Sequence, residues 1–153
     1  MSSNLADDLR EGYRQVAGEL PEEAIELVSR AHDLKHVSLA ERNRSLAAIV
    51  AAYRGGPRRL WGPVLLDLLA PAILERLQRL RAEPPAMDEE EIRQQFVVEV
   101  LRAAAYIPLP ENPVWVKGQV LSRANQAVRR WLAGEGRRQR YQDSYEVKEE
   151  AGW

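Results

Sequence analysis

NPVWVKGQVLSRANQAVRRWLAG, residues 112–134, is the stretch of sequence that decides the fold. Its apolar residues recur every three or four positions, which places them on one face of a helix. They are Val116, Val120, Leu121, Ala124, Val128, Trp131 and Leu132. Asn112 and Pro113 suit a helix cap and a first turn, because asparagine accepts a hydrogen bond there and proline has none to donate. The stretch therefore predicts a long amphipathic helix.

The rest of the chain also carries helical signals and lacks the alternation that is typical of strands. Ser38 and Glu41 form a capping box, in which each side chain satisfies a backbone N–H group of the first helical turn. Pro71 lies inside the very apolar segment 60–80, where it predicts a kink or two abutting helices because proline removes one helical hydrogen bond. Helices are expected over residues 5–17, from 21, from 39, over 60–80, from 88 and over 112–134, with loops at 81–86 and 108–113.

A chain of 153 residues fits one domain. We therefore expect an all-α, single-domain bundle of about five to six helices over residues 1–140. Residues 141–153 follow Gly134 and Gly136, are polar, and end acidic. That composition predicts a mobile tail.

The composition also indicates the compartment. Cysteine is absent, so neither disulfides nor thiolate chemistry is expected. The first residues include Asp7 and Asp8 and no apolar run, which argues against a secretory signal. The longest apolar stretch, residues 64–74, is interrupted by Asp67 and Pro71 and is too short for a membrane span. We expect a soluble, cytoplasmic protein with no membrane partner.

The formal net charge of −1 conceals a strong local asymmetry. Residues 117–140 are basic, with Lys117, Arg123, Arg129, Arg130, Arg137, Arg138 and Arg140 against Glu135 alone. Residues 83–99 are acidic, with Glu83, Asp88, Glu89, Glu90, Glu91 and Glu99 against Arg93. Segments of opposite charge can serve two partners of opposite sign.

Catalytic machinery is hard to find in this sequence. His32 and His36 are four residues apart with Asp33 between them; on a helix they would share one face, as in a metal site, or be ordinary surface histidines near a helix end. Ser29 has no acid to orient a base beside it. The acids at 88–91 point in different directions and suit a helix cap. We expect a non-enzymatic protein with no catalytic residue, no metal and no cofactor.

The basic side of the last predicted helix is the best candidate for function. Arginine pairs with phosphate in bidentate fashion, and an exposed Trp115 or Tyr141 can stack on unpaired bases. A solvated helix face explains the arginines as well. The candidate nucleic-acid-binding residues are Lys117, Arg123, Asn125, Arg129, Arg130, Arg137, Arg138 and Arg140.

Residues 88–98 read DEEEIRQQFVV, and residues 115–125 read WVKGQVLSRAN and are followed by Arg129 and Arg130. The first stretch resembles the acidic helix of the second conserved region in the bacterial sigma-70 family, which docks on RNA polymerase. The second resembles the next helix of that family, whose exposed side faces promoter DNA. The resemblance covers residues 60–140, and the segment 61–80 takes the place of the family's supporting helix.

By this resemblance, Glu90, Glu91 and Gln94 would contact RNA polymerase. The residues facing DNA would be Arg123, Asn125, Arg129 and Arg130. The family's helix-turn-helix for reading the upstream promoter element does not follow, so the resemblance implies a sigma-like fragment, a degenerate relative or an accessory protein. We therefore expect a non-catalytic, sigma-like domain that binds nucleic acid, DNA in the first place, and RNA polymerase in transcription.

The alternative is a helical interaction or assembly subunit of a larger complex. If that complex contains nucleic acid, both hypotheses can hold together. The apolar segment 61–80 can exceed what one small core needs and leave a patch for a partner or for a second copy in a homo-oligomer. The exposure of the leucines in the segment 61–80 distinguishes the two hypotheses. Leucines of this segment on the surface favour assembly, and leucines at the centre of the molecule are core.

Overall fold

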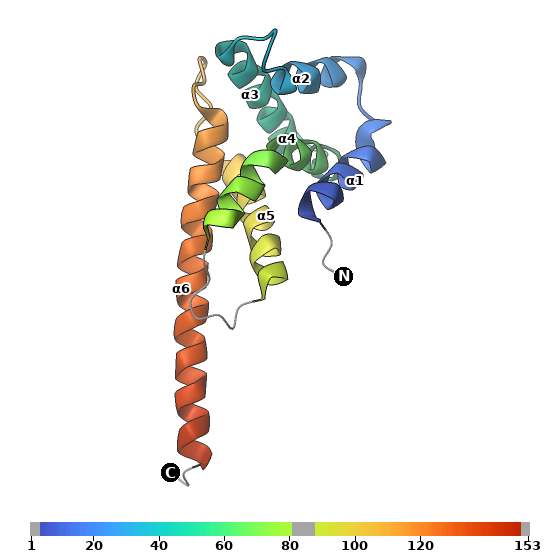
Figure 1. Ribbon diagram of the computed structural model, residues 1–153. Helices are drawn as coiled ribbons and strands as arrows, with labels where there is room; N and C mark the ends of the chain where they lie inside the picture. Colours follow the sequence, from blue (N-terminus) through green and yellow to red (C-terminus); the bar gives the residue numbers. More distant parts are fainter. Residues whose placement is uncertain (1–3, 81–87, 151–153) are drawn as a thin grey trace.

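The computed structural model describes residues 4–80 and 88–150, with the backbone alone at residue 136 and residues 139–150. These residues form six α-helices and no strand, as Figure 1 shows. The helices are α1 (Leu5–Ala17), α2 (Glu22–His32), α3 (Leu39–Gly55), α4 (Arg58–Arg79), α5 (Glu89–Tyr106) and α6 (Val116–Glu150). The predicted all-α bundle is confirmed. Over the same residues, no helix combines the length and the apolar composition that a membrane span requires.

α4 is the central helix of the bundle. It packs against each of the other five, while α1 lies mainly on α4, α2 on α3 and α5 on α6. In Figure 1, α6 runs alongside α5 and continues well past the rest of the bundle. One side of α6 is therefore left without a neighbouring helix.

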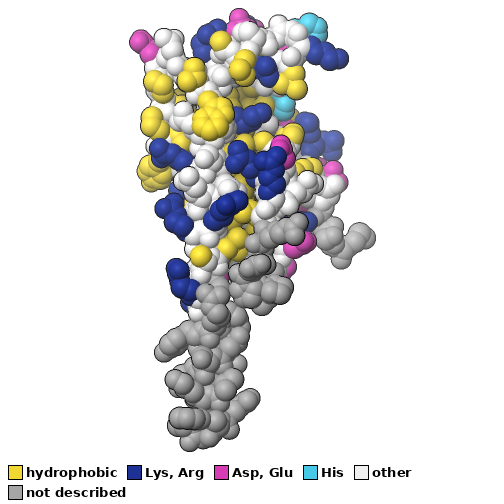
Figure 2. All heavy atoms as spheres, turned by 60° about the vertical axis from the view of Figure 1, so that its left-hand side comes forward, with side chains coloured by type: hydrophobic (Ala, Val, Ile, Leu, Met, Phe, Trp, Pro, Cys, Tyr) yellow, Lys and Arg dark blue, Asp and Glu magenta, His cyan; other side chains and the backbone are white. Residues whose placement is uncertain are grey.

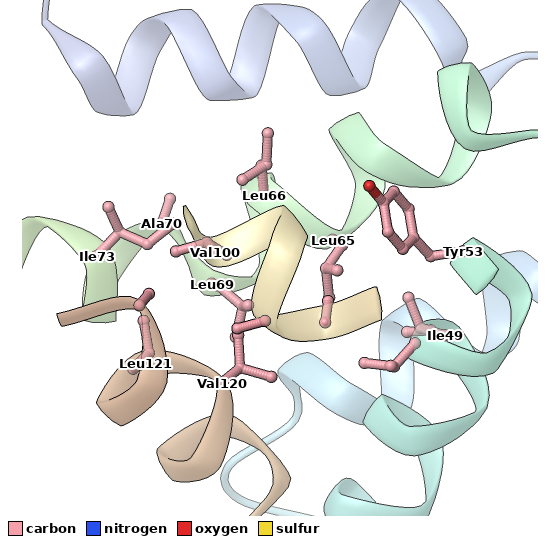
Figure 3. Packing of buried hydrophobic residues seen from close by; sticks show 14 of the residues in the cluster. Ile49, Tyr53, Leu65, Leu66, Leu69, Ala70, Ile73, Val100, Val120 and Leu121 are labelled. Carbon is pink, nitrogen blue, oxygen red and sulfur yellow. The ribbon is translucent and has the colours of Figure 1, made fainter. Parts of the chain in front are cut away.

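The apolar residues of α4 form the middle of the hydrophobic core. Leu65, Leu69 and Ile73 are at most 1% exposed. Figure 3 shows Ile49 of α3 and Val120 of α6 among the residues that surround them. No leucine of the segment 60–80 is among the exposed large hydrophobic residues of the described chain. This segment is core, and it leaves no apolar patch of the kind that the assembly alternative requires.

α4 is one helix through both Pro63 and Pro71. Of the two alternatives predicted at Pro71, two abutting helices are therefore excluded, and a kink stays a prediction. A proline inside a helix costs about 3 kcal/mol or more. Burying one leucine or isoleucine side chain contributes about 1.5–3 kcal/mol. Leu69 and Ile73, two residues on either side of Pro71, are both buried, and their burial offsets the cost of the missing hydrogen bond.

The helix ends follow the sequence at most positions. The side chain of Ser38 accepts a hydrogen bond from the backbone N–H of Glu41 at 3.2 Å. The side chain of Asp88 accepts one from the N–H of Glu90 at 3.1 Å. α6, by contrast, continues beyond Gly134 to Glu150 and is longer than its pattern predicts. The mobility of residues 141–153 stays a prediction, and the loop at 81–86 lies outside the described residues.

An ion pair between two helices leads to the first testable prediction. The Arg10 guanidinium of α1 lies 3.4 Å from the carboxylate of Asp67 of α4, whose side chain is only 4% exposed. We expect Arg10→Gln to lower the free energy of unfolding by about 2 kcal/mol, because it leaves a buried carboxylate without its cation. Urea unfolding followed by circular dichroism measures the change.

Arg14→Gln is the matched control for this prediction. Arg14 lies on the same helix and pairs with Glu11 at 3.8 Å, but both side chains are well exposed. Such surface pairs contribute about 0–1 kcal/mol. Equal losses in the two variants would contradict a special role for the buried Asp67.

Candidate nucleic-acid interface

The start of α6 is set by a contact from a distant helix. The backbone N–H of Val116 donates to the Oδ1 atom of Asn43 on α3 at 3.3 Å. Trp115 precedes the helix with a positive φ of 59°, and its carbonyl accepts the N–H of Gln119 at 3.0 Å. The helix therefore begins three residues after the Asn112–Pro113 pair, and the prediction of a cap there is wrong. Asn43 supplies the cap instead, from 73 residues away in sequence.

The predicted apolar face of α6 packs on the core. Its buried residues are Val116, Val120, Leu121, Ala124, Val128 and Leu132, and Trp131 is half-buried. The opposite side is open to solvent and carries the arginines. Figure 2 shows this face, on which basic side chains follow α6 downward with few acids among them.

The candidate residues do not form one surface. Arg123, Arg130 and Arg137 are all exposed, and their seven-residue spacing places them on one side of the helix, two turns apart. We call these three residues the arginine stripe. At a rise of 1.5 Å per residue, the stripe extends over about 21 Å, close to six base-pair steps of a duplex.

The remaining candidates lie around or away from the stripe. Arg129 is exposed and lies about a quarter of a turn around the helix from the stripe. Asn125 is half-buried and lies further around, next to the apolar face. Arg138 is exposed and bonded to Glu135. Lys117 lines a cavity with residues of α2, α3 and α4. The side chains of Arg140 and Tyr141 lie outside the described residues.

Ion pairing separates the stripe from the arginines of α1, α2 and α5, each of which has a carboxylate partner. Among the described arginines of α3 and α4, Arg42, Arg44, Arg54, Arg58 and Arg76 also have no carboxylate partner. On α1 to α5, arginine–carboxylate pairs are common; they include Arg10–Asp67 at 3.4 Å, Arg30–Glu26 at 2.6 Å, Arg59–Glu19 at 3.2 Å, Arg79–Glu75 at 2.6 Å and Arg102–Glu99 at 2.5 Å. On α6, Arg138 alone has a carboxylate within 4.0 Å among the described residues, Glu135 at 3.0 Å.

The arginine stripe and Arg129 therefore have no carboxylate partner among the residues whose side chains the structure describes. No known protein family, curated protein or solved structure matches this chain. The stripe has the chemistry of a polyanion site, because unpaired guanidinium groups can each donate two parallel hydrogen bonds to a phosphate.

An aromatic side chain stands at the N-terminal end of the same helix. Trp115 is 64% exposed, and its indole ring lies on Gly118, where a Cβ atom would overlap the ring. Glycine at this position thus lets the ring rest directly on the helix backbone. Tyr106, at the end of α5, is 76% exposed. Exposed rings next to a basic helix offer flat surfaces on which bases can stack.

The acidic candidates lie on the first turns of α5. Glu90, Glu91 and Gln94 are all exposed, as a docking role would require. The amide group of Gln94 lies 3.5 Å from the carboxylate of Glu90, and Arg93 lies 3.8 Å from that same carboxylate. These side chains are open to a partner, and their role stays a prediction.

The two histidines do not share a helical face, because α2 ends at His32. Asp33 bonds instead to the turn that follows: the backbone N–H of His36, that of Lys35 and the His36 ring lower the pKa of its carboxyl. Burial lowers the pKa of His32; the Asp67 carboxylate opposes this shift and Arg10 adds to it. Over the described residues, no group of three or more histidines and acids could hold a metal ion.

Proposed function

We propose that this protein binds nucleic acid through the exposed side of α6. The observation that carries the proposal is the arginine stripe, whose three guanidinium groups have no carboxylate partner among the described residues. Neighbouring stripe residues are about 10 Å apart, which matches about three phosphates along one strand. Each arginine of the stripe can therefore pair with a different phosphate.

The chemistry supports contacts to phosphates more than contacts to bases. Arginines on an exposed helix side fix position on the backbone, and this mode of binding depends little on sequence and strongly on salt. Trp115 adds a surface for stacking, which contributes about 1–3 kcal/mol per base when a base is unpaired. We therefore expect tighter binding to single strands that can reach Trp115 than to duplexes of the same length.

The partner that the sigma-like resemblance implies is RNA polymerase. Glu90, Glu91 and Gln94 are exposed on α5 and would dock on a basic surface of the enzyme, while the arginine stripe on α6 meets DNA. Acids on one helix and unpaired arginines on the next suit two partners of opposite charge. This proposal places the protein in transcription in a bacterial cytoplasm.

Fluorescence anisotropy of labelled single- and double-stranded DNA, titrated with the protein at 50 and 200 mM salt, tests the proposal. Three phosphate contacts predict that affinity for duplex DNA falls by about forty-fold between the two salt concentrations. Labelled RNA of the same sequence shows whether the 2′-hydroxyl group matters. Affinity that is the same at both salt concentrations, or no binding at 50 mM, would rule out the proposed phosphate contacts.

A second candidate function is assembly with another protein or a second copy of this chain. Burial of the α4 leucines removes the first reason for it, but Val114 and Trp115, which are neighbours in the sequence just before α6, are 70% and 64% exposed. Tyr106, the last residue of α5, is 76% exposed. Exposed apolar side chains are typical of interaction sites where they form a patch. Light scattering after size-exclusion chromatography measures the mass. A dimer mass would favour self-assembly, and a monomer mass would exclude it.

A further inference from the structure

A cavity of about 200 Å³ lies where α2, α3, α4 and the first turn of α6 meet. Its walls are largely apolar and include Leu39, Leu46 and Leu69. The polar side chains that line it are His32, Arg42, Asn43 and Lys117. No acidic residue lines the cavity. The cavity thus combines an apolar body with a positively charged region.

Arg42 is the residue that indicates an anionic ligand. Its Nε atom is inaccessible to solvent and has no hydrogen-bond partner. A buried donor without an acceptor costs free energy, and native proteins nearly always give such a group a partner. No carboxylate of the described residues pairs with Arg42, so its guanidinium group is available to an anion in the cavity that it lines.

Lys117 adds a second cation to the same cavity. It is the second residue of α6 and is exposed, with no carboxylate within ion-pair distance among the residues that the structure describes. The backbone bond from Val116 to Asn43 fixes this turn of α6 against α3. Arg42 and Lys117 therefore line one cavity from two helices that are held together by a neighbouring contact.

The size of the cavity limits the ligand. An apolar cavity of about 150 Å³ is large enough to bind benzene. A cavity of about 200 Å³ therefore has room for a ring-sized or short branched apolar group. A guanidinium group without a carboxylate partner matches a carboxylate or a phosphate, because both accept two parallel hydrogen bonds.

We propose that this cavity binds a small organic anion, an acidic head group on a compact apolar body. The head group accepts hydrogen bonds from Arg42 and Lys117, and the body packs against Leu39, Leu46 and Leu69. This site is separate from the arginine stripe and does not depend on the proposed nucleic-acid binding. A bound ligand would contact both α3 and the first turn of α6, and so would stabilise the folded chain.

Calorimetric titration of the full chain with benzoate, phenyl phosphate, benzamide and inorganic phosphate tests the proposal. We expect benzoate or phenyl phosphate to bind at least tenfold more tightly than benzamide, which lacks the charge, and than inorganic phosphate, which lacks the apolar body. The tighter of the two ring anions identifies the head group. At a hundred times the dissociation constant, the tighter anion should raise the melting temperature by about 5 °C or more.

The variants Arg42→Gln and Lys117→Gln should each weaken binding of the preferred anion by tenfold or more. Arg44→Gln is the matched control, because Arg44 is exposed on the same helix and does not line this cavity; its affinity should stay within twofold. Lys117→Gln keeps the test informative even if Arg42→Gln fails to fold. Benzamide binding as tightly as both anions, no anion binding at 10 mM, or an equal loss in Arg44→Gln would overturn the proposal.

Discussion

Replacing Arg123, Arg130 and Arg137 together with alanine should weaken binding to duplex DNA by about 500-fold at 100 mM salt. Each lysine or arginine that neutralises a phosphate releases condensed counterions and contributes about 0.9 to the slope of log affinity against log salt. Loss of three contacts should make that slope shallower by about 2.7. The loss should be the same for unrelated DNA sequences, because phosphate contacts carry no sequence information.

The matched control for the triple variant replaces Arg30, Arg59 and Arg79 with alanine. It changes the net charge by the same amount, but each of these arginines already pairs with a carboxylate of the protein. We expect its affinity to fall by less than about fivefold. A loss as large as that of the stripe variant would show that overall charge, and not the arginine stripe, determines binding.

Phe96→Ala should lower the free energy of unfolding by about 3–5 kcal/mol, the largest stability effect that we expect from a single substitution. Phe96 is the one phenylalanine of the chain and is fully buried in the core. Its removal loses buried apolar area and leaves a cavity that neighbouring side chains fill only partly. For a chain of this length, the melting temperature should fall by about 6–20 °C.

Val98→Ala on the same helix provides the comparison. Val98 is 45% exposed, so its truncation should cost less than about 1 kcal/mol. Urea unfolding followed by circular dichroism measures both variants. If Phe96→Ala were no less stable than Val98→Ala, the placement of Phe96 at the centre of the core would be wrong. At temperatures where Phe96→Ala remains folded, its affinity for DNA should be unchanged.

Helical periodicity predicts most of the fold, because an amphipathic helix shows its buried face in its own sequence. The buried apolar face of α6 from Val116 to Leu132 and the capping residue Ser38 are local signals of this kind. The features that differ from prediction depend on distant contacts. α6 begins where Asn43 accepts the N–H of Val116, and α4 passes through Pro71 because residues on both sides of it are buried by other helices.

In the candidate site too, the features that depend on one helix can be predicted from the sequence, and those that depend on distant residues cannot. Helix geometry alone places Arg123, Arg130 and Arg137 on one side of α6, and the structure shows that they are exposed. Helix geometry does not reveal which arginines pair with acids, because a pair such as Arg59–Glu19 joins residues 40 positions apart. The cavity at Arg42 and Lys117 has no sequence signal, since its lining comes from four helices.

The most direct test of the nucleic-acid proposal is an NMR titration that follows the arginine Nε–H signals as a short DNA strand is added. The proposal predicts that the signals of Arg123, Arg130 and Arg137 shift, and that added salt reverses the shifts. The signals of the ion-paired Arg30, Arg59 and Arg79 should stay in place. Equal shifts in both groups, or a saturating titration in which no signal of the arginine stripe moves, would contradict it.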